Sequence, residues 1–177
     1  MAEHVFISHS SKNDAFVKRL RKTLALFDEL SWVDSQELTG GDDLGATLEK
    51  EIRSAKHFIV VLSIAALSSE WVQKEVRWAQ DEMQKRSDGY KIIPVVLPGV
   101  EMGILKLLFP NEPIYIVVED KPTGFDAAMP KIFAALGHQL PEDWETAVEV
   151  RAEPVEELIL ELTDPKIEEK DGTRRAS

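Results

Sequence analysis

The sequence lacks cysteine, which excludes disulfide bonds and thiolate metal sites within this chain. It also lacks any apolar run near the roughly 20 residues that a membrane-spanning helix requires. The first residues, Met1 to His4, do not show the basic-then-apolar pattern of a secretory signal. We therefore expect a cytoplasmic protein that makes no membrane contact.

Basic residues are also few, because 21 lysines and arginines stand against 32 aspartates and glutamates and leave a formal net charge of −11. Binding along a nucleic-acid backbone requires cations that neutralise phosphates, so we expect no direct contact with nucleic acid. One basic cluster has helical spacing and is typical of a solvated face or a protein contact. It consists of Lys18, Arg19, Arg21 and Lys22.

The 177 residues, of which 44% are hydrophobic and 30% charged, have the balance of a globular protein with one main domain. Three prolines interrupt an acidic stretch near the end of the chain, and residues 155–162 alternate as in a strand. We therefore predict a domain over residues 1–140. The extension over 141–177 is predicted to be a linker and the first strand of a further domain.

Short apolar runs alternate along the chain with segments of helical periodicity. The run 57–62 is apolar throughout, which is typical of a strand covered on both faces. A capping-box pair, Ser11 and Asp14, precedes the first helical stripe. Strands that alternate with helices predict a parallel sheet with helices on both faces. The predicted strands span 4–8, 31–35, 57–62, 92–97 and 113–118, and predicted helices include 70–86 and 125–136.

In an open α/β sheet, ligands bind beyond the carboxyl ends of the strands, where the strand order reverses. With the order 2-1-3-4-5, that position lies between the first and third predicted strands. The residues that follow these strands, 8–11 and 63–69, are rich in serine hydroxyls. We therefore expect a polar pocket there that suits a phosphate or a ribose.

Glu75 lies one turn into the helix that follows the third predicted strand. At ~100° per residue it stands about 60° from the apolar stripe through Val72 and Val76, which is a border position. Trp71 precedes it by one turn. Spacing alone leaves a simpler interpretation open, in which Glu75 is exposed, Trp71 packs and Ser69 only caps the helix.

Three segments together resemble the sequence boxes of the TIR (Toll/interleukin-1 receptor) domain family in its prokaryotic form. Residues 5–14 resemble its first box, and residues 33–42 resemble the region that leads through its BB loop. Ser69, Trp71 and Glu75 resemble its Ser-x-Trp-x-x-x-Glu motif. The combination in this order is far more specific than any one box.

The resemblance implies a flavodoxin-like α/β fold, a three-layer sandwich with a five-stranded parallel sheet of order 2-1-3-4-5. The family contains both signalling scaffolds and enzymes that consume NAD⁺. In the enzymes the motif glutamate is catalytic, which makes Glu75 the candidate here. NAD⁺ is then a substrate, and neither a cofactor nor a metal is expected. The candidate pocket residues are Phe6, Ser8, His9, Leu38, Gly40, Ser69 and Trp71.

The chemistry of NAD⁺ explains why one carboxylate can suffice. Its nicotinamide ring is a cationic pyridinium, so it leaves as a neutral molecule and requires no general acid, unlike the leaving group of an ordinary glycoside. The ribose becomes oxocarbenium-like, and an ionised Glu75 would stabilise that charge. Attack by water would give ADP-ribose and attack by an internal nucleophile a cyclic product, and the sequence favours neither.

The resemblance also implies self-association, with the loop over 37–43 of one copy completing the site of a neighbour. We therefore expect a NAD⁺ nucleosidase, also called a NAD⁺ glycohydrolase, that assembly activates and that is nearly inactive as an isolated monomer. Its predicted partners are NAD⁺ and other copies of the domain. The predicted context is the effector part of a larger immune or defence protein.

The main alternative is a TIR scaffold without enzymatic activity, in which Glu75 is only structural. A phospho-acceptor receiver domain shares the architecture, but it requires acidic residues where Ser8 and Ser63 stand. A flavin carrier would use the hydroxyls of residues 8–11 to bind the flavin phosphate.

Overall fold

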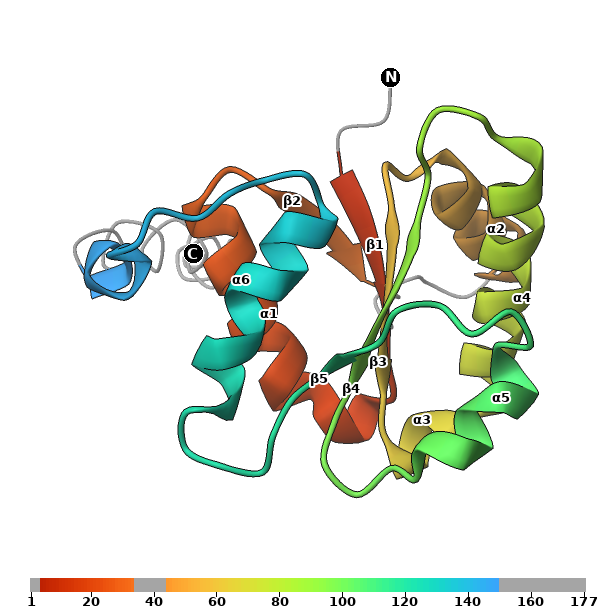
Figure 1. The fold of residues 1–177 in the computed structure, drawn as a ribbon. Coiled ribbons are helices and arrows are strands. Elements are labelled where there is room, and N and C mark those ends of the chain that lie inside the picture. Colours follow the sequence, from red (N-terminus) through yellow and green to blue (C-terminus); the bar gives the residue numbers. More distant parts are fainter. Residues whose placement is uncertain (1–3, 34–43, 150–177) are drawn as a thin grey trace, which may run out of the picture.

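Five parallel strands form the centre of the molecule (Figure 1). The computed structural model describes residues 4–33 and 44–149. The strand order is β2-β1-β3-β4-β5, so the flavodoxin-like α/β fold implied by the sequence resemblance is confirmed. The strands are β1 His4–Ser8, β2 Leu30–Val33, β3 Phe58–Leu62, β4 Ile92–Val96 and β5 Ile116–Val117.

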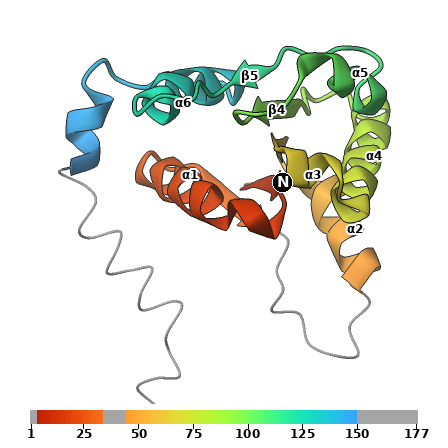
Figure 2. The same cartoon turned by 90° about the horizontal axis from the view of Figure 1, so that it is seen from below.

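Helices cover both faces of the sheet. In Figures 1 and 2, α1 and α6 lie together on one face, and α2 and α4 lie on the other. Among the described residues, no helix has the length and apolarity needed to cross a membrane. The helices are α1 Asp14–Leu26, α2 Leu44–Ser54, α3 Ile64–Leu67, α4 Glu70–Lys85, α5 Leu105–Leu108 and α6 Gly124–Ala135, with 3-10 turns η1 Ser11–Asn13 and η2 Met102–Ile104.

Each face of the sheet has its own hydrophobic core. In β1, Val5 and Ile7 belong to the core beneath α1 and α6, whereas Phe6 belongs to the core beneath α2 and α4. This division follows from the alternation of successive side chains along a strand. Every residue of β3 and β4 is buried. Burial on both faces explains why these two strands are apolar throughout and do not alternate.

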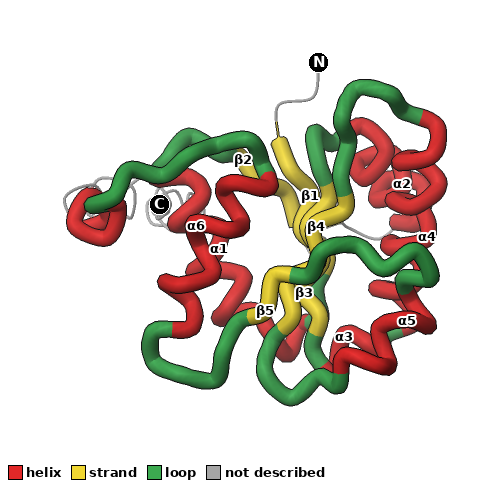
Figure 3. The backbone as a smooth tube through the Cα atoms, in the orientation of Figure 1, coloured by secondary structure: helices red, strands yellow, loops and turns green. Residues whose placement is uncertain are grey.

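The fifth strand is shorter than the sequence predicted. The prediction covered residues 113–118, but β5 contains only Ile116–Val117, between long loops (Figure 3). Ile114 is 90% exposed, and the ring of Tyr115 packs edge-on against Phe109. The prediction was too long because apolar composition does not determine whether a backbone segment pairs with a neighbouring strand.

The start of α1 also differs from the prediction. The sequence predicts a capping box at Ser11 and Asp14, but Ser11 lies in the turn η1 and α1 begins at Asp14. The hydroxyl of Ser10 caps the turn, since it accepts a hydrogen bond from the backbone nitrogen of Lys12 at 3.1 Å. The capping-box prediction is wrong because the tighter turn places the Asp14 carboxylate beside His9.

The chain beyond α6 continues to pack against the domain. Residues 144–149 are helical, and Trp144 is only 6% exposed within the core beneath α1 and α6. Val148 packs against the same core. The boundary predicted at residue 140 stays a prediction, and the strand predicted over 155–162 lies outside the described residues.

The replacement Trp144→Ala is expected to lower the free energy of unfolding by about 3–5 kcal/mol, because it leaves a cavity in a closely packed core. Urea titration followed by circular dichroism measures the change. The matched control is Glu145→Ala at the exposed neighbouring position, with an expected change within about 0.5 kcal/mol. Equal stability of the two variants would show that the helix over 144–149 contributes nothing to the fold.

Candidate active site

The carboxyl ends of β1 and β3 meet at one edge of the sheet. The two strands are direct parallel neighbours, with Ser8 beside Val60 in register. After β1 the chain turns into α1 on one face, whereas after β3 it passes through α3 into α4 on the other face (Figure 1). The strand order therefore reverses at this edge, which is where open α/β sheets bind ligands.

Glu75 of α4 is hydrogen-bonded to Ser8 at this edge. The Ser8 Oγ donates to Oε1 of Glu75 over 2.6 Å, and both residues are completely buried. The border position predicted for Glu75 is therefore wrong. Val72 and Val76 pack α4 so closely against the sheet that the residue between them in the helical turn is enclosed as well. Burying a carboxylate is costly unless it is hydrogen-bonded, and the Ser8 hydroxyl offsets part of that cost.

Ser69 has a definite structural role at the start of α4. It is the N-cap residue, and its hydroxyl accepts a hydrogen bond from the backbone nitrogen of Val72 at 3.2 Å. The side-chain amide of Gln73 donates to the carbonyl oxygen of Leu67 at 2.7 Å. These bonds fix the first turn of the helix that carries Glu75. Contact between Ser69 and a substrate stays a prediction.

Trp71 lies one turn before Glu75 and is partly buried against the core beneath α2 and α4. Its ring meets Trp78 edge-on, with ring centroids 6.1 Å apart. The ammonium group of Lys74 lies 5.4 Å from both ring centroids, within the range of a cation–π interaction. Trp71 therefore belongs to an aromatic and cationic surface of α4 next to the buried carboxylate.

Phe6 lies two residues before Ser8 and points to the same face of the sheet. It is completely buried, stacks on Phe58 at a centroid distance of 5.8 Å and lies 5.3 Å from the ring of Trp32. In the described fold Phe6 is a core residue that supports the β1 segment carrying Ser8. Its predicted contact with a ligand is untested.

His9 follows Ser8 directly and forms a hydrogen bond with Asp14 that sequence reasoning missed. Its side chain is 9% exposed, and its Nε2 lies 2.9 Å from Oδ1 of Asp14. The polar stretch after the first predicted strand was recognised, but a sequence does not reveal which of its side chains a 3-10 turn brings together. The fold thus places a hydrogen-bonded histidine and aspartate at the same sheet edge as Ser8 and Glu75.

A second hydrogen bond joins the loops that follow the two strands. Ser63 Oγ donates to Oδ1 of Asn13 at 2.6 Å and accepts from the backbone nitrogen of Ala66 at 3.0 Å. Sequence reasoning placed Ser63 at this edge but did not identify Asn13 as its partner. The bond ties η1 to the start of α3 and so fixes the two sides of the candidate site.

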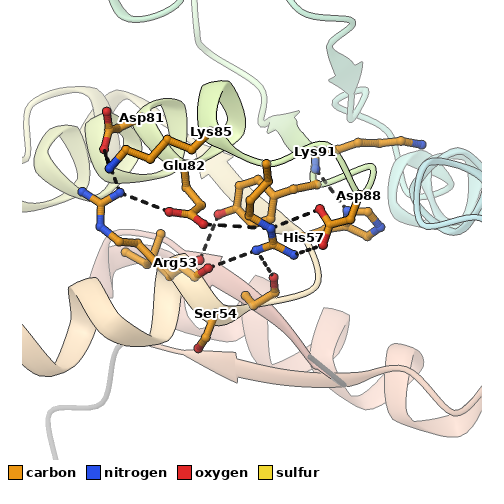
Figure 4. Close-up of polar contacts among 12 residues, drawn as sticks. Arg53, Ser54, His57, Asp81, Glu82, Lys85, Asp88 and Lys91 are labelled. Atoms are coloured by element: carbon orange, nitrogen blue, oxygen red, sulfur yellow. Dashed lines mark hydrogen bonds and ion pairs between the residues drawn. The ribbon is translucent and has the colours of Figure 1, made fainter. Parts of the chain in front are cut away.

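The far end of α4 is held against α2 by an ionic network (Figure 4). Burial acts to lower the pKa of the Arg53 guanidinium, but hydrogen bonds to carboxylates outweigh it and raise the pKa. The group therefore keeps its charge, and the network fixes α4 relative to α2. The three carboxylates lie between 2.8 and 3.3 Å from Arg53 and belong to Glu49, Asp81 and Glu82.

The turn after α4 is bound to the chain before β3 in the same region. The Arg86 guanidinium donates to the carbonyl oxygen of Ala55 at 2.8 Å. His57 Nδ1 accepts from the backbone nitrogen of Lys91 at 3.1 Å (Figure 4). Burial and the charges of Lys91 and Lys56 lower the pKa of His57, so its ring is neutral at pH 7. These contacts lie at the amino edge of the sheet and have a structural role.

Two of the predicted pocket residues lie in a part of the chain that the structure does not describe. Leu38 and Gly40 lie outside the described residues, as does the whole loop over 37–43. Within the described ranges, no group of three or more metal-ligating side chains is present.

Most of the described part of the chain matches a known family profile. The family profile described as TIR domain matches residues 5–132. The matched range begins in β1, ends within α6 and includes both Ser8 and Glu75.

Two relatives match over shorter stretches. The NAD(+) hydrolase PdTIR of Paracoccus denitrificans is 38% identical over 73 residues, which is 41% of this chain and 24% of the relative. The 2' cyclic ADP-D-ribose synthase AbTIR of Acinetobacter baumannii is 30% identical over 90 residues, which is 50% of this chain and 32% of the relative. The chain thus spans 24–32% of the length of these relatives.

A solved structure shares the fold over nearly its whole length. The TIR domain of the Toll-related receptor TRR-2 from Hydra magnipapillata matches with a TM-score of 0.60 and 17% sequence identity. The match covers 76% of this chain and 98% of that chain. Similarity at this level of identity establishes a common architecture and nothing about activity.

The replacement Ser8→Ala is expected to lower the free energy of unfolding by about 1–3 kcal/mol, because it removes a buried hydrogen bond to a carboxylate. Thermal and urea unfolding measure the loss. Ser68→Ala removes an exposed hydroxyl on the same side of the sheet and serves as the control, with little expected change. A Ser8→Ala variant as stable as the control would contradict an energetic role for the 2.6 Å bond.

Proposed function

Because the chain belongs to the TIR domain family, we propose that it cleaves the bond between nicotinamide and ribose in NAD⁺, with Glu75 as the catalytic carboxylate. The observation that carries this proposal is the burial of Glu75 at the sheet edge, hydrogen-bonded to Ser8. A carboxylate that water does not solvate interacts more strongly with a developing positive charge than an exposed one. NAD⁺ is the substrate in this scheme, and the proposal requires no cofactor.

The proposed step breaks the bond between the anomeric carbon of the ribose and the pyridinium nitrogen. The electron pair of that bond passes to the nitrogen, so nicotinamide departs as a neutral molecule. No proton has to be supplied to it, unlike the alkoxide leaving group of most glycosides. A site with one carboxylate and no second acid is therefore sufficient for this reaction.

The positive charge then lies on the ribose ring. Glu75 would stabilise it through its charge, and Ser8 would hold one carboxylate oxygen in a fixed orientation through the 2.6 Å bond. Attack by water on the anomeric carbon, with loss of a proton to solvent, gives ADP-ribose. Attack by a hydroxyl of the same molecule, which likewise loses its proton to solvent, gives a cyclic product.

The relatives support this reaction class and leave the product open. The name of PdTIR describes a NAD(+) hydrolase and that of AbTIR a cyclic ADP-D-ribose synthase, so related TIR proteins include both outcomes. We propose the glycosidic cleavage for this chain and do not assign the nucleophile. The two products share the same first step and the same demand on Glu75.

Activation by self-assembly is the second part of the proposal. The family resemblance supports TIR–TIR contacts in which the loop over 37–43 of one copy completes the site of another. In this scheme a larger parent protein brings the copies together, and an immune or defence role fits that arrangement. The isolated domain would then be nearly inactive.

One observation favours the alternative of a non-enzymatic scaffold. In the described fold, each residue of the Ser-x-Trp-x-x-x-Glu motif already has a structural contact. Ser69 caps α4, Trp71 packs against Trp78, and Glu75 accepts a hydrogen bond from Ser8. A motif retained for folding alone would have these contacts too, so only a catalytic measurement separates the two functions.

The replacement Glu75→Gln distinguishes the enzyme from the scaffold, because the amide keeps an oxygen acceptor for Ser8 but removes the charge. If the enzymatic proposal holds, nicotinamide release falls by roughly 10²–10³-fold, as is usual when a group that stabilises transition-state charge is lost. The measurement uses protein clustered on an oligomerising fusion partner, incubated with NAD⁺ and analysed by chromatography. Thermal unfolding checks that the variant is folded.

Glu70→Gln provides the matched control, because Glu70 is an exposed acid in the first turn of the same helix. Its activity should equal that of the unmodified protein. Absence of nicotinamide release by the unmodified protein in every clustered form would favour the scaffold.

A further inference from the structure

His9 has one ring nitrogen with a hydrogen-bond partner and one without. Nε2 lies 2.9 Å from Oδ1 of Asp14, whose side chain is 70% exposed. Nδ1 is buried and has no partner in the structure, and the whole side chain is only 9% exposed. The imidazole is thus oriented through one nitrogen, while the other is enclosed without a bonding partner.

The pairing with Asp14 determines which nitrogen carries the proton. An ionised carboxylate can only accept a hydrogen bond, so Nε2 must be the donor. In the neutral ring Nδ1 is then an acceptor with a free lone pair. A buried acceptor without a donor is unfavourable, and native proteins rarely retain one without a reason.

The position of His9 explains why the structure retains this unpaired acceptor. It follows Ser8 directly, and Ser8 donates to the buried carboxylate that we propose acts on the ribose. The 3-10 turn η1, which begins two residues after His9, is tied to the start of α3 by the bond between Ser63 and Asn13. The unmatched acceptor therefore belongs to the same sheet edge as the proposed catalytic group and is attached to a well-fixed segment.

Building on the proposed function, we infer that Nδ1 of His9 accepts a hydrogen bond from a hydroxyl of the nicotinamide ribose. A ribose hydroxyl is a donor, whereas the phosphate oxygens of the same substrate can only accept. His9 is thus a substrate-binding residue that recognises a hydroxyl of the sugar. Asp14 is a positioning residue, because it holds the proton on Nε2 and keeps Nδ1 free to accept.

Two replacements of His9 each keep one of its two hydrogen bonds and remove the other. In His9→Asn the side-chain amide lies near the place of Nδ1, so an acceptor is kept and the contact with Asp14 is lost. In His9→Gln the amide lies near the place of Nε2, so the contact with Asp14 is kept and the acceptor is lost. If Nδ1 of His9 binds a ribose hydroxyl, His9→Gln lowers kcat/KM on the order of tenfold and His9→Asn lowers it much less. The reverse order would overturn the inference, because it would mean that only the contact with Asp14 matters.

Analogues of NAD⁺ that lack the 2′- or the 3′-hydroxyl of the nicotinamide ribose make the test specific. For the hydroxyl bound by His9, removal should lower kcat/KM of His9→Gln much less than that of the unmodified protein. Comparing the two proteins cancels the intrinsic reactivity of each analogue, as in a double-mutant cycle. Equal discrimination by both proteins against both analogues would overturn the inference.

Nitrogen-15 NMR of the His9 ring tests the same contact without catalysis and so separates it from the proposed function. The free protein should show the tautomer protonated at Nε2, and Asp14→Ala should shift the tautomer equilibrium. Saturating ADP-ribose should move the Nδ1 resonance, whereas ADP, which lacks the second ribose, should not. A shift with ADP-ribose would support the inference even if no nicotinamide were released, and no shift would overturn it.

Discussion

The bond between Ser8 and Glu75 is the interaction on which the arrangement of this edge depends. It joins the end of β1 to the first turns of α4 through two residues that lie 67 positions apart in the chain. A carboxylate enclosed by protein is stable only if the surrounding groups hydrogen-bond to it, so the position of α4 over the sheet is constrained by that single side chain as well as by apolar packing. The same constraint gives the carboxylate a fixed orientation in surroundings from which water is excluded.

Both ends of α4 are fixed by different physical means. At its start, the hydroxyl of Ser69 satisfies a backbone donor that the helix leaves unpaired. At its far end, the Arg53 guanidinium joins α2 to carboxylates on the last turns. Between these points, Val72 and Val76 fill the core. A helix held in this way presents Glu75 with little freedom, which is the usual requirement for a group that acts by electrostatic preorganisation.

The sequence predicted the architecture well because the signals for it are local and repeated. Continuous apolar runs identified β3 and β4, and the motif spacing placed Glu75 on the correct helix at the correct edge. Two kinds of detail were not accessible. The extent of β5 depends on backbone pairing, which the apolar residues around Ile114 do not reveal. The burial of Glu75 and the pairing of His9 with Asp14 depend on how closely a helix and a turn approach the sheet, and no periodicity encodes that distance.

The helix that contains Trp144 lies beyond the range that the family profile matches, yet its indole fills the core on the side of α1 and α6. Val148, one turn further along, packs against the same core. The hydrophobic core on this side of the sheet therefore extends past the outline of the family profile into a short additional helix, and cutting the chain directly after α6 would open that core to water.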